Sequence, residues 1–228
     1  MSMPVASAEE TLTKTAVDRL VQDIVSGALA PGKKLRIELL KEQYQIGASP
    51  LREALTRLSA LGFVTNKSRR GFRVASVSQE DFQDITIVRE MIETTALRRS
   101  IEQESYEWEA NVVSALARLR LKLSRLQAKG GEIDWLDVES IHKEYHVALM
   151  SGCGSERLLT LQSILYDQAT RYRYLASPKI PNMREFAKSH EVLTEAVLSK
   201  EVERACAAMV RHLRLFATLY SSIRRLDK

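Results

Sequence analysis

The sequence is poor in residues that interrupt helices and in cysteine. Its 228 residues include 9 glycines, 5 prolines and 2 cysteines. Glycine and proline are the residues least compatible with helix interiors, so their scarcity favours long helices over a fold rich in strands and turns. Two cysteines, Cys153 and Cys206, are too few for a disulfide framework, and we expect both to be small buried hydrophobic residues.

The sequence also lacks segments that direct a protein to or through a membrane. The first residues, MSMPVASAEE, contain neither the basic region nor the apolar stretch of a secretory signal peptide. No apolar run approaches the roughly 18 residues that a membrane-spanning helix requires. We therefore expect a cytoplasmic protein without a membrane partner, and we expect residues 1–10 to be a disordered segment.

Excess positive charge is confined to the first third of the chain. Residues 1–77 contain 12 Lys and Arg against 7 Asp and Glu, whereas residues 78–228 contain 22 of each. Two explanations stay open at this point. One is a solvated basic face, and the other is a small nucleic-acid-binding domain joined to a neutral partner domain.

Three stretches of the first third carry apolar residues at helical spacing. The first ends at Gly27, the second spans residues 37–45, and the third spans residues 50–61. We expect Ser49 to cap the third helix and Pro50 to be its first residue, because proline is well tolerated where helix N–H groups have no partner.

Two short strands are expected after the third helix, at residues 63–65 and 72–74, with the basic turn NKSRRG between them. Three helices followed by a basic hairpin form a winged helix-turn-helix. A role as a protein-binding module is the less favoured alternative, given the localised positive charge. The third helix would enter the major groove, where the candidate contacts are Ser49, Arg52 and Thr56. The wing would contact phosphates or a narrow minor groove through Lys67, Arg69 and Arg70.

The segment GALAPGKKLRIELLKEQYQIGASPLREALTRLSALGFVTNKSRRGFRV resembles the DNA-binding domain of GntR-family bacterial transcription regulators. The shared features are PG before the second helix, P-x-R-E-A-L at the start of the third, L-x-x-L-G at its end, and R-G in the wing. The chain departs from the family at Gly47 and Ala48, where a serine and an arginine are usual. The resemblance thus implies DNA binding with a different operator sequence. The full set of candidate DNA contacts is Arg36, Ser49, Arg52, Thr56, Lys67, Arg69, Arg70 and Gly71.

From residue 78 onward the sequence shows almost no strand pattern. Apolar residues recur at helical spacing in six segments, and Ser78 and Asp81 are the expected caps of the first. We therefore expect a mainly α protein, with a winged helix-turn-helix at 11–77 and an all-α bundle at 78–228. The expected helices of the bundle cover residues 78–103, 108–126, 134–150, 155–175, 183–199 and 201–224.

The chain has only four histidines, and all lie on apolar helix faces of the second region. His142 and His146, in the run ESIHKEYH, are one helical turn apart, a spacing at which two imidazoles chelate one metal ion. His190 and His212 follow on later helices. A single buried histidine is usually a satisfied core residue. Four imidazoles without partners would be costly to bury, so we predict a shared metal ion.

Three runs of this region, VREMIETTALRRS, IHKEYHVALMSGCGSERLL and SHEVLTEAVLSKEVERACAAMVRHL, resemble the FadR-type (FCD) effector domain of GntR regulators. In many members an Asp-x-x-x-His pair and two later histidines hold a divalent metal. The resemblance places His142 where the aspartate stands, and the three histidines at His146, His190 and His212. All-imidazole ligation suits Zn²⁺, Ni²⁺ or Cu²⁺ better than Mn²⁺ or Mg²⁺, so we expect Zn²⁺ or Ni²⁺. Glu139 is an alternative source of the missing carboxylate.

The expected effector is a small carboxylate metabolite that binds the metal directly. Four neutral imidazoles would leave the charge of a divalent ion uncompensated, which favours an anionic ligand. The resemblance implies that Arg89 holds this ligand, and the alternative is an ordinary ion pair with Glu93 one turn on. In the run RYRY, Arg171 and Arg173 are further candidates to face the same cavity, and solvent-facing charges are the alternative.

Together these features predict a transcription regulator and not an enzyme. A homodimer would place two winged helices on the half-sites of a palindromic double-stranded DNA operator, and effector binding would alter their arrangement. Three alternatives stay open. They are a metal-responsive regulator without an organic effector, a metal-dependent hydrolase, and a polar histidine core that binds no metal.

Overall fold

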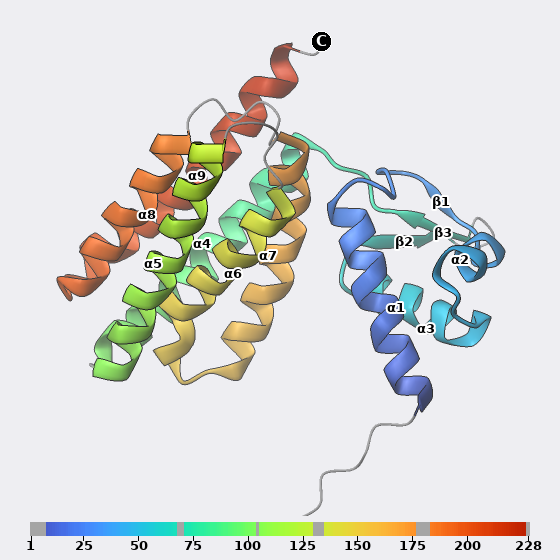
Figure 1. The fold of residues 1–228 in the computed structure, drawn as a ribbon, viewed down its shortest axis with the longest axis horizontal. Helices are drawn as coiled ribbons and strands as arrows, with labels where there is room; N and C mark the ends of the chain where they lie inside the picture. Colours follow the sequence, from blue (N-terminus) through green and yellow to red (C-terminus); the bar gives the residue numbers. More distant parts are fainter. Residues whose placement is uncertain (1–7, 68–70, 104, 130–134, 177–182, 227–228) are drawn as a thin grey trace, which may run out of the picture. The chain divides into compact units, whose positions relative to one another are not determined.

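Figure 1 shows the computed structural model of the chain, which describes residues 8–67, 71–103, 105–129, 135–176 and 183–226. The chain divides into two compact units, Met1–Val77 and Ser78–Lys228. Within the described ranges, none of the helices combines the length and apolar character needed to cross a membrane.

The first unit contains three helices and a small antiparallel sheet with the strand order β1-β3-β2. Helix α1 packs on α3, and their shared core includes Leu20, Leu51 and Leu55, all fully buried. Arg73 of the central strand pairs with Lys34 on one side and Thr65 on the other. This arrangement confirms the predicted winged helix-turn-helix. Its elements are α1 Ala8–Val25, β1 Lys34–Leu35, α2 Ile37–Tyr44, α3 Ala48–Ala60, β2 Val64–Lys67 and β3 Gly71–Val74.

The expected disorder of residues 1–10 is wrong at its last three positions. Residues 8–10 form the first turn of α1. Their sequence, Ala-Glu-Glu, combines good helix formers with the negative charge that a helix N-terminus favours. Residues 1–7 lie outside the described residues.

The start of α3 and one strand also differ from the prediction. Helix α3 begins at Ala48 and follows an extended Gly47, so Ser49 is not its cap. Pro50 fits at the third position because none of the first N–H groups of a helix has an intrahelical partner. Strand β1 was not predicted, since two residues are too few to show an alternating pattern.

The second unit contains, in the described residues, six α-helices and one short 3-10 helix, η1. Helix α4 contacts α6, α7, α9 and η1 and therefore lies at the centre of the bundle. The Ser78 side chain accepts a hydrogen bond of 3.1 Å from the backbone N–H of Asp81, which confirms its predicted role as a cap. The elements are α4 Gln79–Glu102, α5 Tyr106–Lys129, α6 Trp135–Met150, η1 Ser151–Cys153, α7 Glu156–Ala176, α8 Met183–Leu198 and α9 Val202–Leu226.

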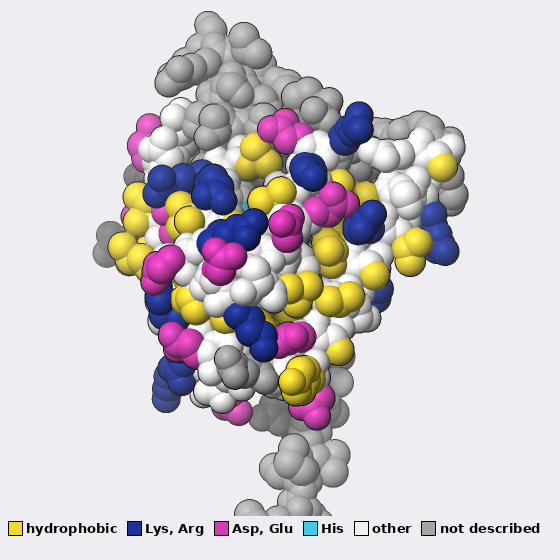
Figure 2. Space-filling model, turned by 90° about the vertical axis from the view of Figure 1, so that its left-hand side faces the viewer, with side chains coloured by type: hydrophobic (Ala, Val, Ile, Leu, Met, Phe, Trp, Pro, Cys, Tyr) yellow, Lys and Arg dark blue, Asp and Glu magenta, His cyan; other side chains and the backbone are white. Residues whose placement is uncertain are grey.

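The surface of the second unit carries mixed charge. Figure 2 shows Lys and Arg side chains interspersed with Asp and Glu side chains over one face. Ion pairs of this unit include Arg120 with Glu191 at 3.2 Å and Lys200 with Glu109 at 3.0 Å. Exposed pairs of this kind contribute only ~0–1 kcal/mol each. The second unit thus has no net charge and carries acidic and basic side chains close together, whereas the first unit is basic.

Candidate functional site

Four histidines from three helices meet in the core of the second unit. His142 and His146 lie on α6, His190 lies on α8, and His212 lies on α9. Their exposed fractions are 2%, 0%, 1% and 4%, which confirms that all four face the interior. One ring nitrogen from each histidine lies within 4.8 Å of the others.

The apolar stripe of α6 explains why its two histidines point inward. Val138, Tyr145 and Leu149 are fully buried. Residues three and four positions apart share one face of a helix, so burial of this stripe carries His142 and His146 into the core with it. The same periodicity buries His212 beside Met209 on α9.

Two of the histidines donate from Nδ1 to groups that can only accept. His146 Nδ1 lies 3.0 Å from Oε2 of Glu93 on α4, and His190 Nδ1 lies 2.6 Å from the carbonyl oxygen of Phe186. Burial alone would raise the pKa of Glu93, but the Arg89 guanidinium and the His146 ring lower it to about 2. The carboxylate is therefore ionised, and both Nδ1 atoms carry the proton.

His212 donates to a hydroxyl whose own proton is already used. Its Nδ1 lies 3.1 Å from Oγ of Ser189, and the Ser189 hydroxyl donates to the Phe186 carbonyl at 2.7 Å. A hydroxyl has a single proton, so Ser189 accepts from the ring. Burial and the neighbouring histidines hold the pKa of His212 well below its ordinary value, and the ring is neutral.

His142 has the same arrangement with a tyrosine. Its Nδ1 lies 2.9 Å from the hydroxyl of Tyr166 on α7, and this hydroxyl donates to Oε2 of Glu139 at 3.0 Å. Burial would raise the pKa of Glu139, but the guanidinium of Arg173 holds it well below its ordinary value. The Tyr166 hydroxyl therefore lies within hydrogen-bonding distance of both the ionised carboxylate and His142 Nδ1.

When every Nδ1 carries the ring proton, the Nε2 lone pairs of His142, His146 and His212 face one another. His146 Nε2 lies 3.1 Å from His142 Nε2 and 3.2 Å from His212 Nε2. His190 Nε2 is buried and has no hydrogen-bond partner among the described residues. Lone pairs at these distances repel, and an unpartnered buried nitrogen costs free energy. Burial lowers the pKa of His142 to about 3, so protonation of that ring does not relieve the repulsion near neutral pH.

The two shortest spacings between these nitrogens are compatible with ligation of one divalent cation. With Zn–N bonds of about 2.0–2.1 Å, adjacent ligand nitrogens lie about 3.3 Å apart in a tetrahedron and about 2.9 Å apart in an octahedron. The two contacts at His146 Nε2, 3.1 and 3.2 Å, lie between these values. Each Nδ1 also lies within hydrogen-bonding distance of a carboxylate, carbonyl or hydroxyl, as the second nitrogen of a metal-bound histidine commonly does. The four histidines form a buried cluster that could hold a metal ion.

The three arginines predicted to bind the effector are all buried. Arg89 is 6% exposed, and Arg171 and Arg173 are each 4% exposed. The alternative of solvent-facing charges at 171 and 173 is therefore wrong, because α7 is covered by α4, α6 and α9 together. Arg89 Nε donates to Glu93 at 2.7 Å, and Arg173 donates twice to Glu139, at 2.8 and 2.7 Å. Arg89 thus neutralises Glu93, which contacts His146 directly. Arg173 neutralises Glu139, which contacts His142 through the Tyr166 hydroxyl.

Glu139 lies behind His142 and not among the Nε2 atoms. Its Oε2 lies 3.6 Å from His142 Nδ1, on the side of the ring away from the cluster. Sequence reasoning considered Glu139 as a ligand, and it missed the supporting roles of Tyr166 and Ser189. The sequence spacing of Tyr166 and Ser189 does not relate them to the histidines, because the contacts form only when α7 packs beside α6 and α8 packs beside α9. Cys153 and Cys206 are buried, as predicted.

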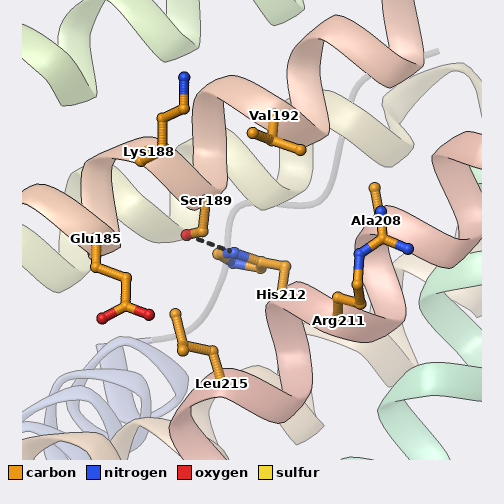
Figure 3. A pocket seen from close by; sticks show the side chains of 8 residues that line it. All are labelled: Glu185, Lys188, Ser189, Val192, Ala208, Arg211, His212 and Leu215. Atoms are coloured by element: carbon orange, nitrogen blue, oxygen red, sulfur yellow. Dashed lines mark hydrogen bonds between the residues drawn. The ribbon is translucent and has the colours of Figure 1, made fainter.

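A surface hollow of about 220 Å³ lies against His212, between α8 and α9. Figure 3 shows His212 joined to Ser189 by its hydrogen bond, with Val192 on α8 and Arg211 and Leu215 on α9 also lining the hollow. The hollow therefore reaches one histidine of the cluster on its Ser189 side.

Arg36 at the start of α2, and Ser49 and Arg52 on α3, are predicted DNA contacts, and all three are exposed. Thr56 is also exposed, and its hydroxyl donates to the Arg52 carbonyl at 2.9 Å, which leaves its oxygen free to accept. Within the described residues, neither Arg36 nor Arg52 has a side-chain hydrogen bond or ion pair. Both guanidinium groups are thus available to a polyanion.

The wing is described only in part. Gly71 begins β3 with a φ of +70°, a conformation that L side chains rarely adopt, which explains glycine at this position. Lys67 ends β2. Arg69, Arg70 and the side chain of Lys67 lie outside the described residues.

Comparison with known proteins matches both units. Residues 12–74 match the gntR family of bacterial regulatory proteins, and residues 84–215 match the FCD domain. The HTH-type transcriptional repressor GlaR of Escherichia coli K12 is 36% identical over 209 residues, which cover 89% of this chain and 94% of that protein. The HTH-type transcriptional regulator BphR of Paraburkholderia xenovorans LB400 is 34% identical over 92% of this chain and 85% of its own length.

A solved structure supports the fold. The structure of E. coli McbR/YncC has a TM-score of 0.77 to this chain at 22% sequence identity, and covers 96% of this chain and 100% of its own. At this identity the similarity shows the fold alone, and the function follows from the sequence matches. The chain therefore belongs to the GntR family of bacterial regulatory proteins and is a DNA-binding transcription regulator with an FCD domain as its second unit.

Proposed function

We propose that this regulator binds a palindromic operator as a homodimer, and that a divalent metal and a small organic acid bound in the FCD domain modulate this binding. The observation that carries the proposal is the convergence of one ring nitrogen from each of four buried histidines within 4.8 Å of one another, with His190 Nε2 lacking a hydrogen-bond partner among the described residues. Operator binding in bacteria takes place in the cytoplasm, where the chromosome lies.

The metal site would use His142, His146, His190 and His212 as ligands. All four are nitrogen donors, which favours Zn²⁺ or Ni²⁺ over Mg²⁺ or Mn²⁺. When bound, the metal supplies a Lewis acid that a carboxylate oxygen can join. Glu93 and Glu139 are matched in charge by Arg89 and Arg173, so the charge of the ion would stay uncompensated until an anion binds.

Arg89 is the arginine best placed to contact this anion. It uses Nε for Glu93, and its two terminal nitrogens make no further hydrogen bond among the described residues. Glu93 in turn contacts His146, so Arg89 lies one side chain away from the cluster. Helix α4, which carries Arg89, begins at Gln79, only a few residues after β3 ends at Val74. An anion that moves α4 would therefore act on the segment that joins the two units, which gives the coupling a physical route.

Arg52→Ala is expected to weaken operator binding by ~1–3 kcal/mol, or about 5- to 150-fold, because it removes an unpaired guanidinium from the exposed side of α3. The operator is first selected from a random DNA pool with the wild-type protein, and affinities are then compared by fluorescence anisotropy at one salt concentration. Arg125→Ala, which removes an exposed arginine from α5, is the control. Equal affinities for Arg52→Ala and the control would contradict this role, and failure of the wild type to enrich any sequence would contradict operator binding.

A metal-responsive regulator without an organic effector is the second candidate. It is favoured by the ion pairs of Arg89 and Arg173, which already occupy two of the groups available to a carboxylate. Operator affinity is therefore measured with the metal alone and with the metal plus mono- or dicarboxylates. A response to metal that no carboxylate changes would select this candidate.

A further inference from the structure

Tyr166 contacts two guanidinium groups, and its hydroxyl contacts both His142 and Glu139. The Arg89 carbon Cζ lies 5.2 Å from the centre of its ring, and that of Arg173 lies 4.5 Å away. The ring is 1% exposed. Lys143 Nζ lies 5.9 Å from the same centre, and cations over an electron-rich ring are attracted to its face. The ring also contacts His142 and His146, with centroids 5.7 and 5.5 Å away, so these neighbours together position the Tyr166 hydroxyl.

The hydroxyl has two possible uses for its one proton. If it donates to Glu139, as the distance of 3.0 Å indicates, its oxygen accepts from His142 Nδ1 and leaves Nε2 free. If it donates to His142 Nδ1 instead, the ring proton moves to Nε2 and points at His146 Nε2, 3.1 Å away. Only the first arrangement leaves His142 able to bind a metal through Nε2.

Glu139 decides between the two arrangements. An ionised carboxylate is a stronger acceptor than a neutral imidazole nitrogen, because its hydrogen bonds are charge-assisted. Arg173 keeps Glu139 ionised and fixes both of its oxygens. Tyr166 is therefore the hydrogen-bond acceptor for His142 Nδ1, as the Glu93 carboxylate is for His146 Nδ1.

We infer that Tyr166 and Glu139 are positioning residues that hold His142 as the tautomer protonated at Nδ1, with Nε2 directed into the cluster. The inference deepens the proposed function and rests on it for its purpose, since a fixed tautomer matters only if His142 is a ligand. The tautomer itself can be measured without any metal. The two ideas can therefore fail separately.

The test is the tautomer of His142 in metal-free, full-length protein, read from ¹⁵N–¹H correlations of the histidine rings. We expect the wild type to show His142 protonated at Nδ1, and Tyr166→Phe to shift a large part of the population to protonation at Nε2. Tyr166→Phe keeps the ring that contacts the two arginines and removes only the hydroxyl. Tyr172→Phe is the matched control, because Tyr172 is a second buried tyrosine of α7 whose hydroxyl donates to a carboxylate, that of Asp81.

A wild-type protein with His142 protonated mainly at Nε2 would overturn the inference, and so would a Tyr166→Phe spectrum identical to that of the control. The second readout is Zn²⁺ affinity by competition with a chelator. Tyr166→Phe is expected to bind Zn²⁺ about 10- to 100-fold more weakly than the wild type, as loss of an outer partner typically does, while Tyr172→Phe keeps wild-type affinity. A wild type that binds no Zn²⁺ would contradict the proposed metal site, and the ring spectra would still decide the role of Tyr166.

Discussion

Replacement of His146 by alanine is expected to lower the affinity for Zn²⁺ by more than about 100-fold, because loss of an outer-shell partner alone typically costs about 10- to 100-fold. The Nε2 of His146 lies within 3.2 Å of the Nε2 atoms of His142 and His212. The substitution removes one ligand and also a neighbour that helps to position the remaining histidines. A competition titration against a chromophoric chelator measures the change.

Tyr145→Phe is the control for this variant. Tyr145 is the neighbouring residue of α6 and is fully buried, and its hydroxyl contacts Thr194 and the His190 carbonyl but none of the Nε2 atoms. It is expected to keep wild-type affinity for Zn²⁺. Unchanged affinity in His146→Ala would mean that the cluster does not bind the metal.

Glu93→Gln is expected to destabilise the metal-free protein by ~3–5 kcal/mol, since it leaves Arg89 as a buried charge without its counterion. The two side chains are 0% and 7% exposed, so solvent cannot take over the role of the carboxylate. The glutamine also weakens the hydrogen bond that fixes His146, so Zn²⁺ affinity should fall as well, by about 10- to 100-fold. Urea unfolding in the presence of a chelator gives the free energy of unfolding.

A double variant separates the two effects. Arg89→Met combined with Glu93→Met removes both charges, and buried ion pairs can often be replaced in this way at little cost. We expect the double variant to regain most of the stability lost in Glu93→Gln while its affinity for Zn²⁺ stays low, because His146 still lacks its acceptor. A free energy of unfolding for Glu93→Gln within about 1 kcal/mol of the wild type would show that the pair does not neutralise a buried charge.

The sequence predicts the helical architecture and the ligand candidates because both depend on periodicity. Val138, Tyr145 and Leu149 define the inner face of α6, and that face carries His142 and His146 with it. The apolar neighbours of His190 and His212 predict the same for α8 and α9. A period of 3.6 residues is a local property of the chain, so no knowledge of the packing between helices is needed.

The outer partners of the histidines are not predictable in this way. Tyr166 reaches His142 from α7, 24 positions away, and Glu93 reaches His146 from α4, 53 positions away. Residues so far apart in the sequence come into contact only when the helices of the bundle pack together. Arg173 was expected to face an effector or solvent, whereas in the structure it binds Glu139. Two local features were also not predictable. Strand β1 has only two residues, which is too few to show an alternating pattern of apolar and polar residues. Gly47 is the N-terminal cap of α3 but has no side chain that could identify it as a cap in the sequence.

The proposed function depends most on metal binding by the four converging histidines. The most direct measurement is the metal content of untagged protein, purified without added metal or chelator, by inductively coupled plasma mass spectrometry. We predict about one Zn²⁺ or Ni²⁺ per chain, as four imidazole ligands favour. Protein that carries no metal, and whose thermal unfolding does not change on addition of Zn²⁺ or Ni²⁺, would contradict the claim.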